Sequence, residues 1–282
     1  MSQQEITLIS NAVLALGQVV SADGGGFQGP SIDDFFPNAV LFAGTPFALN
    51  RVLLVRLFAT AVIVAILWIG SSRLKVVPSR GQAAWEFLID FPRVSIVNDT
   101  LGEKDGKRFM PLIMAMFFGT LAWNLTGVIP GLQIASTGLI GQALIMAAIA
   151  YVTFIYAGIR KHGTGGFIAH SLWLPGVPIA IKPVIAVLEF LSTFIVRPVT
   201  LTLRLTMNMV AGHMLLALCF LATNFFFFTV LAGGNPLGLL GIGSFAFGIA
   251  FTVLELFVGA LQAYIFAILT AIYIQMAIAD EH

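Results

Sequence analysis

The sequence predicts an all-α protein that crosses a membrane several times. Of its 282 residues, 59% are hydrophobic and only 10% are charged, and the mean hydropathy is +0.98. A soluble domain typically carries about 25% charged residues. Apolar tracts of about 20 residues, the length that a helix needs to cross a bilayer, recur along the chain. Together these observations predict a polytopic helical membrane protein embedded in a lipid bilayer.

The spans follow one another from residue 51 onward, after an N-terminal segment, 1–50, that we expect outside the cytoplasm. Segment 81–97 mixes aromatic and charged side chains, which is typical of an amphipathic helix at the membrane interface rather than of a span. The predicted spans are 52–72, 109–130, 138–159, 178–231 and 238–279.

Cationic residues predict the orientation of these spans. They are concentrated in the connections 73–108 and 160–170, whereas residues 1–50 carry acidic residues and no lysine or arginine. By the positive-inside rule, the two cationic connections are cytoplasmic and the N-terminus is outside. Arg51 and Arg56 depart from this rule, and we expect their long stems to reach toward the interface.

The tract 178–231 has two interpretations. As one helix it would be about 80 Å long, much longer than a perpendicular crossing requires. It is either two spans broken at Pro198 or one steeply tilted helix. The first interpretation gives six spans with both ends outside, and the second gives five spans with a cytoplasmic C-terminus.

Arginines lie inside this apolar tract, and a guanidinium keeps its charge at any biological pH. An arginine at mid-membrane costs about 2.5–3.5 kcal/mol on insertion scales, so it usually faces a partner charge or a wet cavity. Arg197 is a candidate for snorkelling, as is Lys182. Arg204 lies far from both ends of the tract, and no nearby carboxylate shares its helical face. Its counter-charge is therefore expected on another chain.

The other polar residues of the last two tracts each have a functional and a structural interpretation. Glu189 either takes part in ion movement or neutralises Lys182. Asn208 and Gln262 either lie beside the arginine or form hydrogen bonds between helices. His213 and Glu255 either relay protons near neutral pH or satisfy each other. Gly248 and Gly259 lie close to the stripe that carries Glu255, and such small residues permit another helix to approach closely.

Several function classes are excluded by what the sequence lacks. It has no nucleophile elbow, no glycine-rich phosphate loop and no redox-ligand set, so we expect no catalytic chemistry and no cofactor. The lone Cys219 excludes an internal disulfide and a CxxC metal site, and no metal is expected. The net charge of +1 and the lack of a basic patch predict no nucleic-acid partner. A stand-alone proton-coupled secondary transporter would place paired ionisable sites at a repeat interface, and we find no internal repeat.

Three motifs resemble those of subunit a of the F-type ATP synthases. The pattern R-P-x-x-L-x-x-R-L-x-x-N-M-x-A-G runs from Arg197 through Gly212, and L-Q-A-Y-I-F-x-x-L-T runs from Leu261 to Thr270. The segment from Asn124 to Gly131 is similar to N-L-x-G-x-x-P at the end of the family's second span. Similarity covers residues 35–282, with the motifs in the family's order.

The resemblance implies five crossings, with the last two helices forming a long, steeply tilted hairpin against a ring of c subunits. It also implies peripheral-stalk b subunits and other ATP synthase subunits as partners, in a bacterial plasma membrane or, alternatively, an organelle inner membrane. Position by position, Arg204 matches the essential arginine, with Asn208 and Gln262 beside it. His213 and Glu255 match an acid–base pair of the outer half-channel, Asn124 is a further lining residue, and Glu189 resembles an acid on the cytoplasmic exit path.

The sequence departs from the family's pattern in two places. The spacing of Glu189 to the Arg-Pro pair differs by one residue from that in some members. Thr206 and Met207 replace the more usual Phe and Gly or Ala of the arginine motif, and we expect this exchange to alter packing only.

Overall fold

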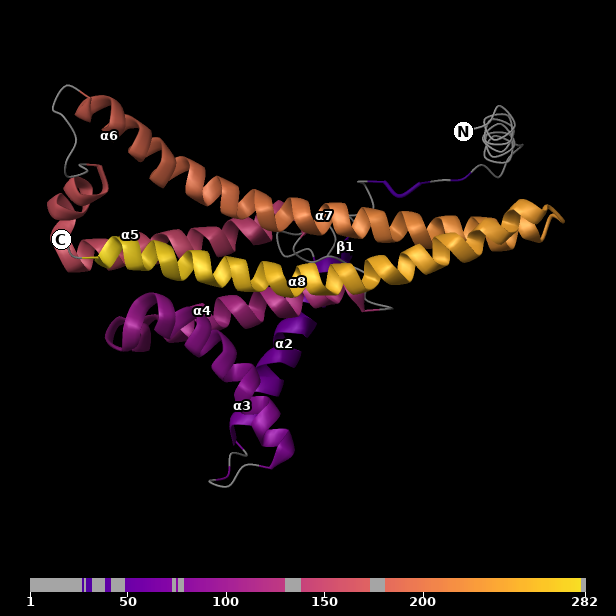
Figure 1. Cartoon of the computed structure of the whole chain (residues 1–282), viewed down its shortest axis with the longest axis horizontal. Coiled ribbons are helices and arrows are strands. Elements are labelled where there is room, and N and C mark those ends of the chain that lie inside the picture. Colours follow the sequence, from indigo (N-terminus) through magenta and orange to yellow (C-terminus); the bar gives the residue numbers. More distant parts are fainter. Residues whose placement is uncertain are drawn as a thin grey trace, which may run out of the picture. The chain divides into compact units, whose positions relative to one another are not determined.

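The structure is a computed structural model that describes residues 27, 29–31, 39–41, 49–72, 75, 79–129, 138–172 and 181–279, with 39–41 and the last five of the 138–172 range as backbone only. Five helical segments of this described part are long and apolar enough to cross a membrane, which confirms the predicted polytopic all-α fold (Figure 1). Most of the N-terminal segment 1–50 lies outside the described residues, as do Arg73, Pro130 and Gly131.

Helices dominate the described chain, and a small antiparallel pair of strands precedes them. Asn50 caps the first helix, because its Oδ1 accepts a hydrogen bond from the Leu53 amide at 3.0 Å. Ser79 caps the next helix by accepting from the Gln82 amide at 3.3 Å. The elements are β1 (Ala39–Leu41), β2 (Leu49–Asn50), α2 (Arg51–Ser72), α3 (Arg80–Pro92), η2 (Arg93–Asn98), α4 (Asp99–Val128), α5 (Ile140–Leu172), α6 (Lys182–Leu191), η4 (Ser192–Val196), α7 (Arg197–Asn224), η5 (Phe225–Leu231), η6 (Pro236–Leu239) and α8 (Leu240–Ile278).

The tract around Pro198 is one helical segment, Lys182–Leu231, of 50 residues. Proline has no amide hydrogen, so it cannot donate to the carbonyl four residues earlier. The π-helical turn η4 lies directly before it, and there the Arg197 amide donates to the Ser192 carbonyl, five residues back. This local widening of the helix accommodates the proline without ending the segment. Of the two interpretations, the continuous helix is therefore the one observed, and the break at Pro198 is wrong.

The chain divides into two compact units. One contains the described residues of 37–210 and 256–279, and we call it the core unit. The other contains the described residues of 1–36 and 211–255, and we call it the hairpin unit.

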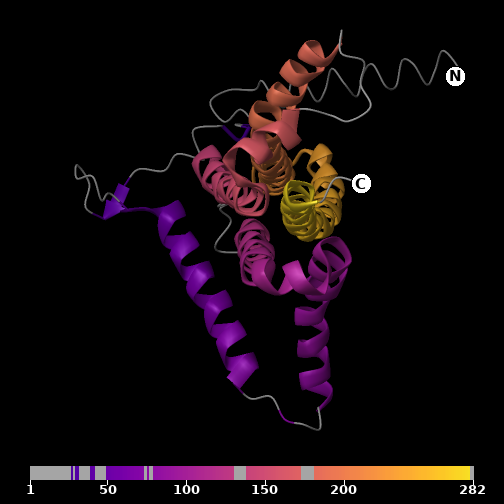
Figure 2. The same ribbon diagram turned by 90° about the vertical axis from the view of Figure 1, so that its left-hand side faces the viewer.

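In the core unit, α4, α5, the first part of α7 and the last part of α8 lie side by side, as Figure 2 shows from one end. Alanines on α8 at 263, 267 and 271 are fully buried against Ile113 and Phe117 of α4. Phe266 of α8 packs with Leu205 of α7 and with alanines of α5. Small side chains thus let α8 pack closely against its neighbours, as is usual between membrane helices.

In the hairpin unit, the chain turns between η5 and η6. Gly234 adopts a φ of 81°, a left-handed conformation that favours glycine at this position. Ser244 and Thr223 share a hydrogen bond of 2.9 Å between their hydroxyls, which links the two arms. A Cβ on Gly248 would lie 3.2 Å from the Phe220 ring, so this glycine does permit the predicted close approach.

Gly259 permits the corresponding approach in the core unit. A Cβ there would lie 3.3 Å from the Cβ of Asn124 on α4, tighter than most real contacts. A larger side chain must therefore push α4 and α8 apart.

We expect Gly259→Val to destabilise the purified protein by about 1–3 kcal/mol, because it overpacks the α4–α8 contact. The matched control is Gly243→Val on the same helix, where an added Cβ meets nothing within 4 Å. Thermal unfolding in detergent measures both variants. Equal melting temperatures for the two would contradict the contact.

Candidate functional site

Arg204 lies on the exposed face of α7. Leu201, Leu205 and Met209 of the same helix are buried, and Leu203 and Met207 are exposed like the arginine. The guanidinium therefore sits on an exposed surface between two large apolar side chains. Within the described parts of the chain, no carboxylate forms an ion pair with it. This is the arrangement expected if its counter-charge comes from another chain.

Gln262 of α8 is buried, and its amide nitrogen has no hydrogen-bond partner among the described residues. The Thr206 hydroxyl of α7 is likewise buried and unpartnered within the described chain. An unmade hydrogen bond at a buried polar group costs about 1–3 kcal/mol, so native proteins rarely retain one without a water or a ligand. Asn208, one turn after Arg204, is half-buried. Thr206 thus adds a polar group, besides altering the packing.

Asn124 lies near the end of α4 and is 2% exposed. Its Nδ2 donates a hydrogen bond of 2.9 Å to the Gly259 carbonyl of α8. A carbonyl inside a helix normally accepts one hydrogen bond, from the amide four residues later, and keeps a second lone pair free. The Gly259 carbonyl uses that second lone pair for Asn124, so the bond ties α4 to α8. Asn124 therefore holds α8 against α4 at the level of Gly259.

Glu189 of α6 forms an ion pair with Arg197, with 3.4 Å between Oε1 and Nη2. The Thr193 hydroxyl donates to the same oxygen at 3.1 Å. Arg197 also lies over the ring of Tyr273, 5.4 Å from its centroid, and its Nη1 is 4.0 Å from the sulfur of Met276. The observed partner of Glu189 is thus Arg197 rather than Lys182, and Arg197 is held by α6 and α8 instead of extending freely toward an interface.

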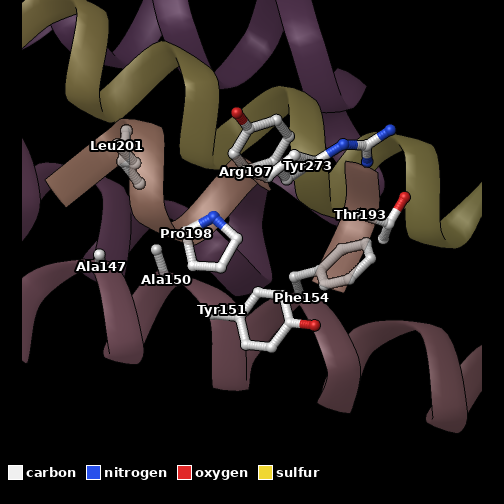
Figure 3. A pocket seen from close by; sticks show the side chains of 9 residues that line it. All are labelled: Ala147, Ala150, Tyr151, Phe154, Thr193, Arg197, Pro198, Leu201 and Tyr273. Atoms are coloured by element: carbon white, nitrogen blue, oxygen red, sulfur yellow. The ribbon is translucent and has the colours of Figure 1, made fainter. Parts of the chain in front are cut away.

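A small cavity lies beside this ion pair (Figure 3). Its volume is about 10 Å³, which is close to the room that one water molecule needs. The walls come from α5, η4, α7 and α8, with Pro198 against the alanines at 147 and 150. Tyr151 and Tyr273 provide the largest side chains, and the Tyr151 hydroxyl is buried without a hydrogen-bond partner in the described residues.

Glu255 is the single acid in the described helix α8, and it is 5% exposed. Its carboxylate packs on Gly212, where a Cβ would come within 3.0 Å of Oε1. Neither carboxylate oxygen accepts a hydrogen bond from any described residue, His213 included. His213 is half-buried and follows Gly212 directly in the chain. The structure thus brings the acid to the backbone beside the imidazole without a direct hydrogen bond between the two.

Sequence reasoning did not single out the tyrosines around Arg197. The chain has only four tyrosines, and Tyr151 and Tyr273 lie inside predicted spans. A phenol in a bilayer needs a partner for its hydroxyl, so each tyrosine inside a predicted span was a usable signal. Spacing along the sequence could not predict that helices far apart in the chain bring both tyrosine rings to one arginine.

Fold and site together define a polytopic helical membrane protein with a fixed cation on an exposed helix face and one buried acid, Glu255, in its last long helix. The family profile described as ATP synthase A chain matches residues 53–275. Similar curated proteins, each named ATP synthase subunit a, come from Rhodococcus erythropolis, Frankia alni and Gluconacetobacter diazotrophicus. The first is 45% identical over 257 residues, covering 91% of this chain and 92% of the relative. The second is 36% identical over 262 residues, covering 91% of this chain and 88% of the relative. The third is 39% identical over 226 residues, covering 78% of this chain and 85% of the relative.

The chain therefore belongs to the ATP synthase A chain family, and the resemblance predicted from its three motifs is confirmed.

The Glu189–Arg197 pair predicts energetic coupling between these two side chains. In a double-mutant cycle with Glu189→Gln and Arg197→Gln, we expect a coupling energy of about 1 kcal/mol, because both groups are partly shielded from water. Unfolding in denaturant measures it. The control pair is Asp90 and Arg93, 3.6 Å apart but about half exposed, for which we expect almost no coupling. Equal coupling in the two pairs would mean that the Glu189–Arg197 contact is not shielded.

Proposed function

We propose that this chain is the proton-translocating stator subunit of an F-type ATP synthase in a bacterial plasma membrane. In this proposal it works beside a rotating ring of c subunits and is held by the b subunits of the peripheral stalk. Family membership supports the assignment. The observation that carries the mechanism is Arg204, a permanent cation on an exposed apolar face with no ion pair in the described chain.

Arg204 provides the electrostatic step. A deprotonated carboxylate cannot pass through lipid without a large cost, but it can rest beside a guanidinium. A protonated carboxyl is neutral and can move on into the bilayer. The arginine thus holds each ring carboxylate while it is charged, and its positive charge repels protons that would leak directly between the two aqueous paths. Asn208, Gln262 and Thr206 offer polar groups on the same or the opposing helix.

The entry path is assigned to His213, Glu255 and Asn124. Glu255 is buried without hydrogen-bond donors among the described residues, so its carboxyl can take up and pass on a proton. An imidazole is a common proton carrier in proteins, and His213 lies next to the glycine on which the acid packs. Asn124 fixes α8 against α4 through the Gly259 carbonyl.

The exit path is assigned to Glu189. Its carboxylate pairs with Arg197 and accepts a hydrogen bond from the Thr193 hydroxyl, and these contacts hold it in one position on the proposed path. One charge that moves across 100 mV releases about 2.3 kcal/mol, so several protons are needed for each ATP. The directed flow of protons past a rotating ring therefore couples the membrane potential to ATP synthesis.

A stand-alone proton-coupled transporter is the alternative function. It would pair its intramembrane charges within its own chain. Arg204 has no such pair in the described residues, which favours the stator.

Replacing Arg204 with Ala should abolish ATP-linked proton transport, because no group then holds the charged ring carboxylate. Pumping in inverted membrane vesicles, followed with a pH-sensitive dye, measures this. The control is Met207→Ala, an exposed apolar neighbour on the same face, which should pump normally. The ring should co-purify with both variants. Normal pumping by the Arg204 variant would refute its role.

Replacing Glu255 with Gln should slow proton conduction by about 10²-fold or more, because the relay loses its titratable group. Passive proton flow through complexes stripped of their soluble part measures it. Thr252→Val is the matched control on the same helix, since that hydroxyl only bonds back to the Gly248 carbonyl at 2.7 Å. An unchanged rate in an intact complex would make Glu255 a structural residue.

A further inference from the structure

Two arginines from different helices of the core unit meet at one tyrosine. Arg108 of α4 donates to the Tyr156 hydroxyl through Nη2 at 3.1 Å, and Arg160 of α5 donates to the same oxygen through Nη1 at 2.8 Å. Arg108 also lies over the ring of Tyr156, 5.5 Å from its centroid. The hydroxyl has two lone pairs, and both guanidinium groups use it. Two like charges are therefore gathered at a single neutral acceptor.

The charge of this cluster is not compensated within the described chain. Neither Arg108 nor Arg160 forms an ion pair with a carboxylate in the residues that the structure describes. Each guanidinium has five N–H donors, and the hydroxyl takes only one from each. Donors that remain in such a converging pair match the oxygens of a phosphate group, which arginine binds in a bidentate manner.

An apolar stripe leads away from the two arginines along α5. It consists of exposed side chains three or four positions apart, which places them on one face of the helix. Tyr156, 51% exposed, is the last ring on this face before Arg160. The stripe is formed by Ile145, Ile149, Val152, Tyr156 and Ile159.

Both helices change direction just beyond the cations. Gly102 has a φ of 71° and Gly163 a φ of 74°, so the regular helical path of α4 starts after the first and that of α5 ends at the second. Arg108 and Arg160 thus stand at the ends of the apolar stretches. The positive-inside rule places both ends at the cytoplasmic surface, where anionic lipids bind basic pockets between helices.

We propose that Arg108, Arg160 and Tyr156 form a binding site for the headgroup of an anionic phospholipid, with an acyl chain along the stripe on α5. The phosphate lies against the two guanidinium groups and offsets their mutual repulsion. The apolar stripe distinguishes a lipid from a free anion, since inorganic phosphate would gain nothing from it. The site is separate from the residues assigned to proton movement.

The test uses the intact complex that contains this chain, reconstituted in phosphatidylcholine nanodiscs. A small fraction of photoactivatable phosphatidylglycerol is added in one sample and photoactivatable phosphatidylcholine with the same acyl chains in another. Mass spectrometry of the digested protein then quantifies labelling of the 138–160 region. We expect phosphatidylglycerol to label this region more strongly, and excess inorganic phosphate to leave that labelling in place.

Variants assign the preference to the cluster. Each cation near an anionic headgroup contributes a factor of about fivefold, so Arg108→Gln with Arg160→Gln should reduce the preference by about 25-fold. The control double variant, Arg80→Gln with Arg93→Gln, removes the same charge from α3 and η2, and it should retain the preference for phosphatidylglycerol. Tyr156→Phe keeps both charges and should lower the preference by about fivefold or less, because only the shared acceptor is lost. It also serves as the test if the double variant fails to assemble.

Four results would overturn the proposal. They are equal labelling by the two lipids, a preference that survives in the arginine double variant, displacement of the lipid by phosphate, and no labelling of the stripe by either probe because another subunit covers it.

Discussion

A guanidinium keeps its proton at every biological pH, and Arg204 presents one on the exposed face of α7, beside Leu203 and Met207. Lipid cannot compensate this charge, and no carboxylate of the described chain pairs with it. The rest of the core unit is arranged so that the opposite face of α7 is buried through Leu201, Leu205 and Met209. Packing thus orients the helix, and orientation leaves the arginine exposed for an external partner.

Long apolar helices can hold polar groups only where the protein itself satisfies them. Some threonine hydroxyls are satisfied by a carbonyl of their own helix, four residues back. Thr202 donates to the Pro198 carbonyl and Thr223 donates to the Cys219 carbonyl. The π-helical turn before Pro198 likewise compensates for the backbone amide hydrogen that the proline lacks. Glu255, Gln262 and Thr206 are not satisfied in this way within the described residues, and the proposed proton path uses the first two of them.

The two arginines of α7 differ in their surroundings although they stand seven residues apart on one helical face. Arg197 contacts Glu189, Tyr273 and Met276, whereas Arg204 is exposed without an ion pair in the described chain. Helical spacing predicts that the two share a face, but it cannot tell which one meets a neighbouring helix. That depends on where α6 and α8 pass, which is why Glu189 pairs with Arg197 instead of Lys182.

Composition and span length determined the polytopic helical fold, because a bilayer accepts few other ways to satisfy the backbone. The motifs around Arg204 and Gln262 determined the family. Whether the chain continues as a helix through Pro198 was decided only by the structure, since a π turn can absorb the missing hydrogen bond. The tertiary structure alone also brought Arg108 of α4 to Tyr156 of α5 and Asn124 of α4 to Gly259 of α8. Such contacts join helices through side-chain packing, and sequence periodicity carries information about one helix at a time.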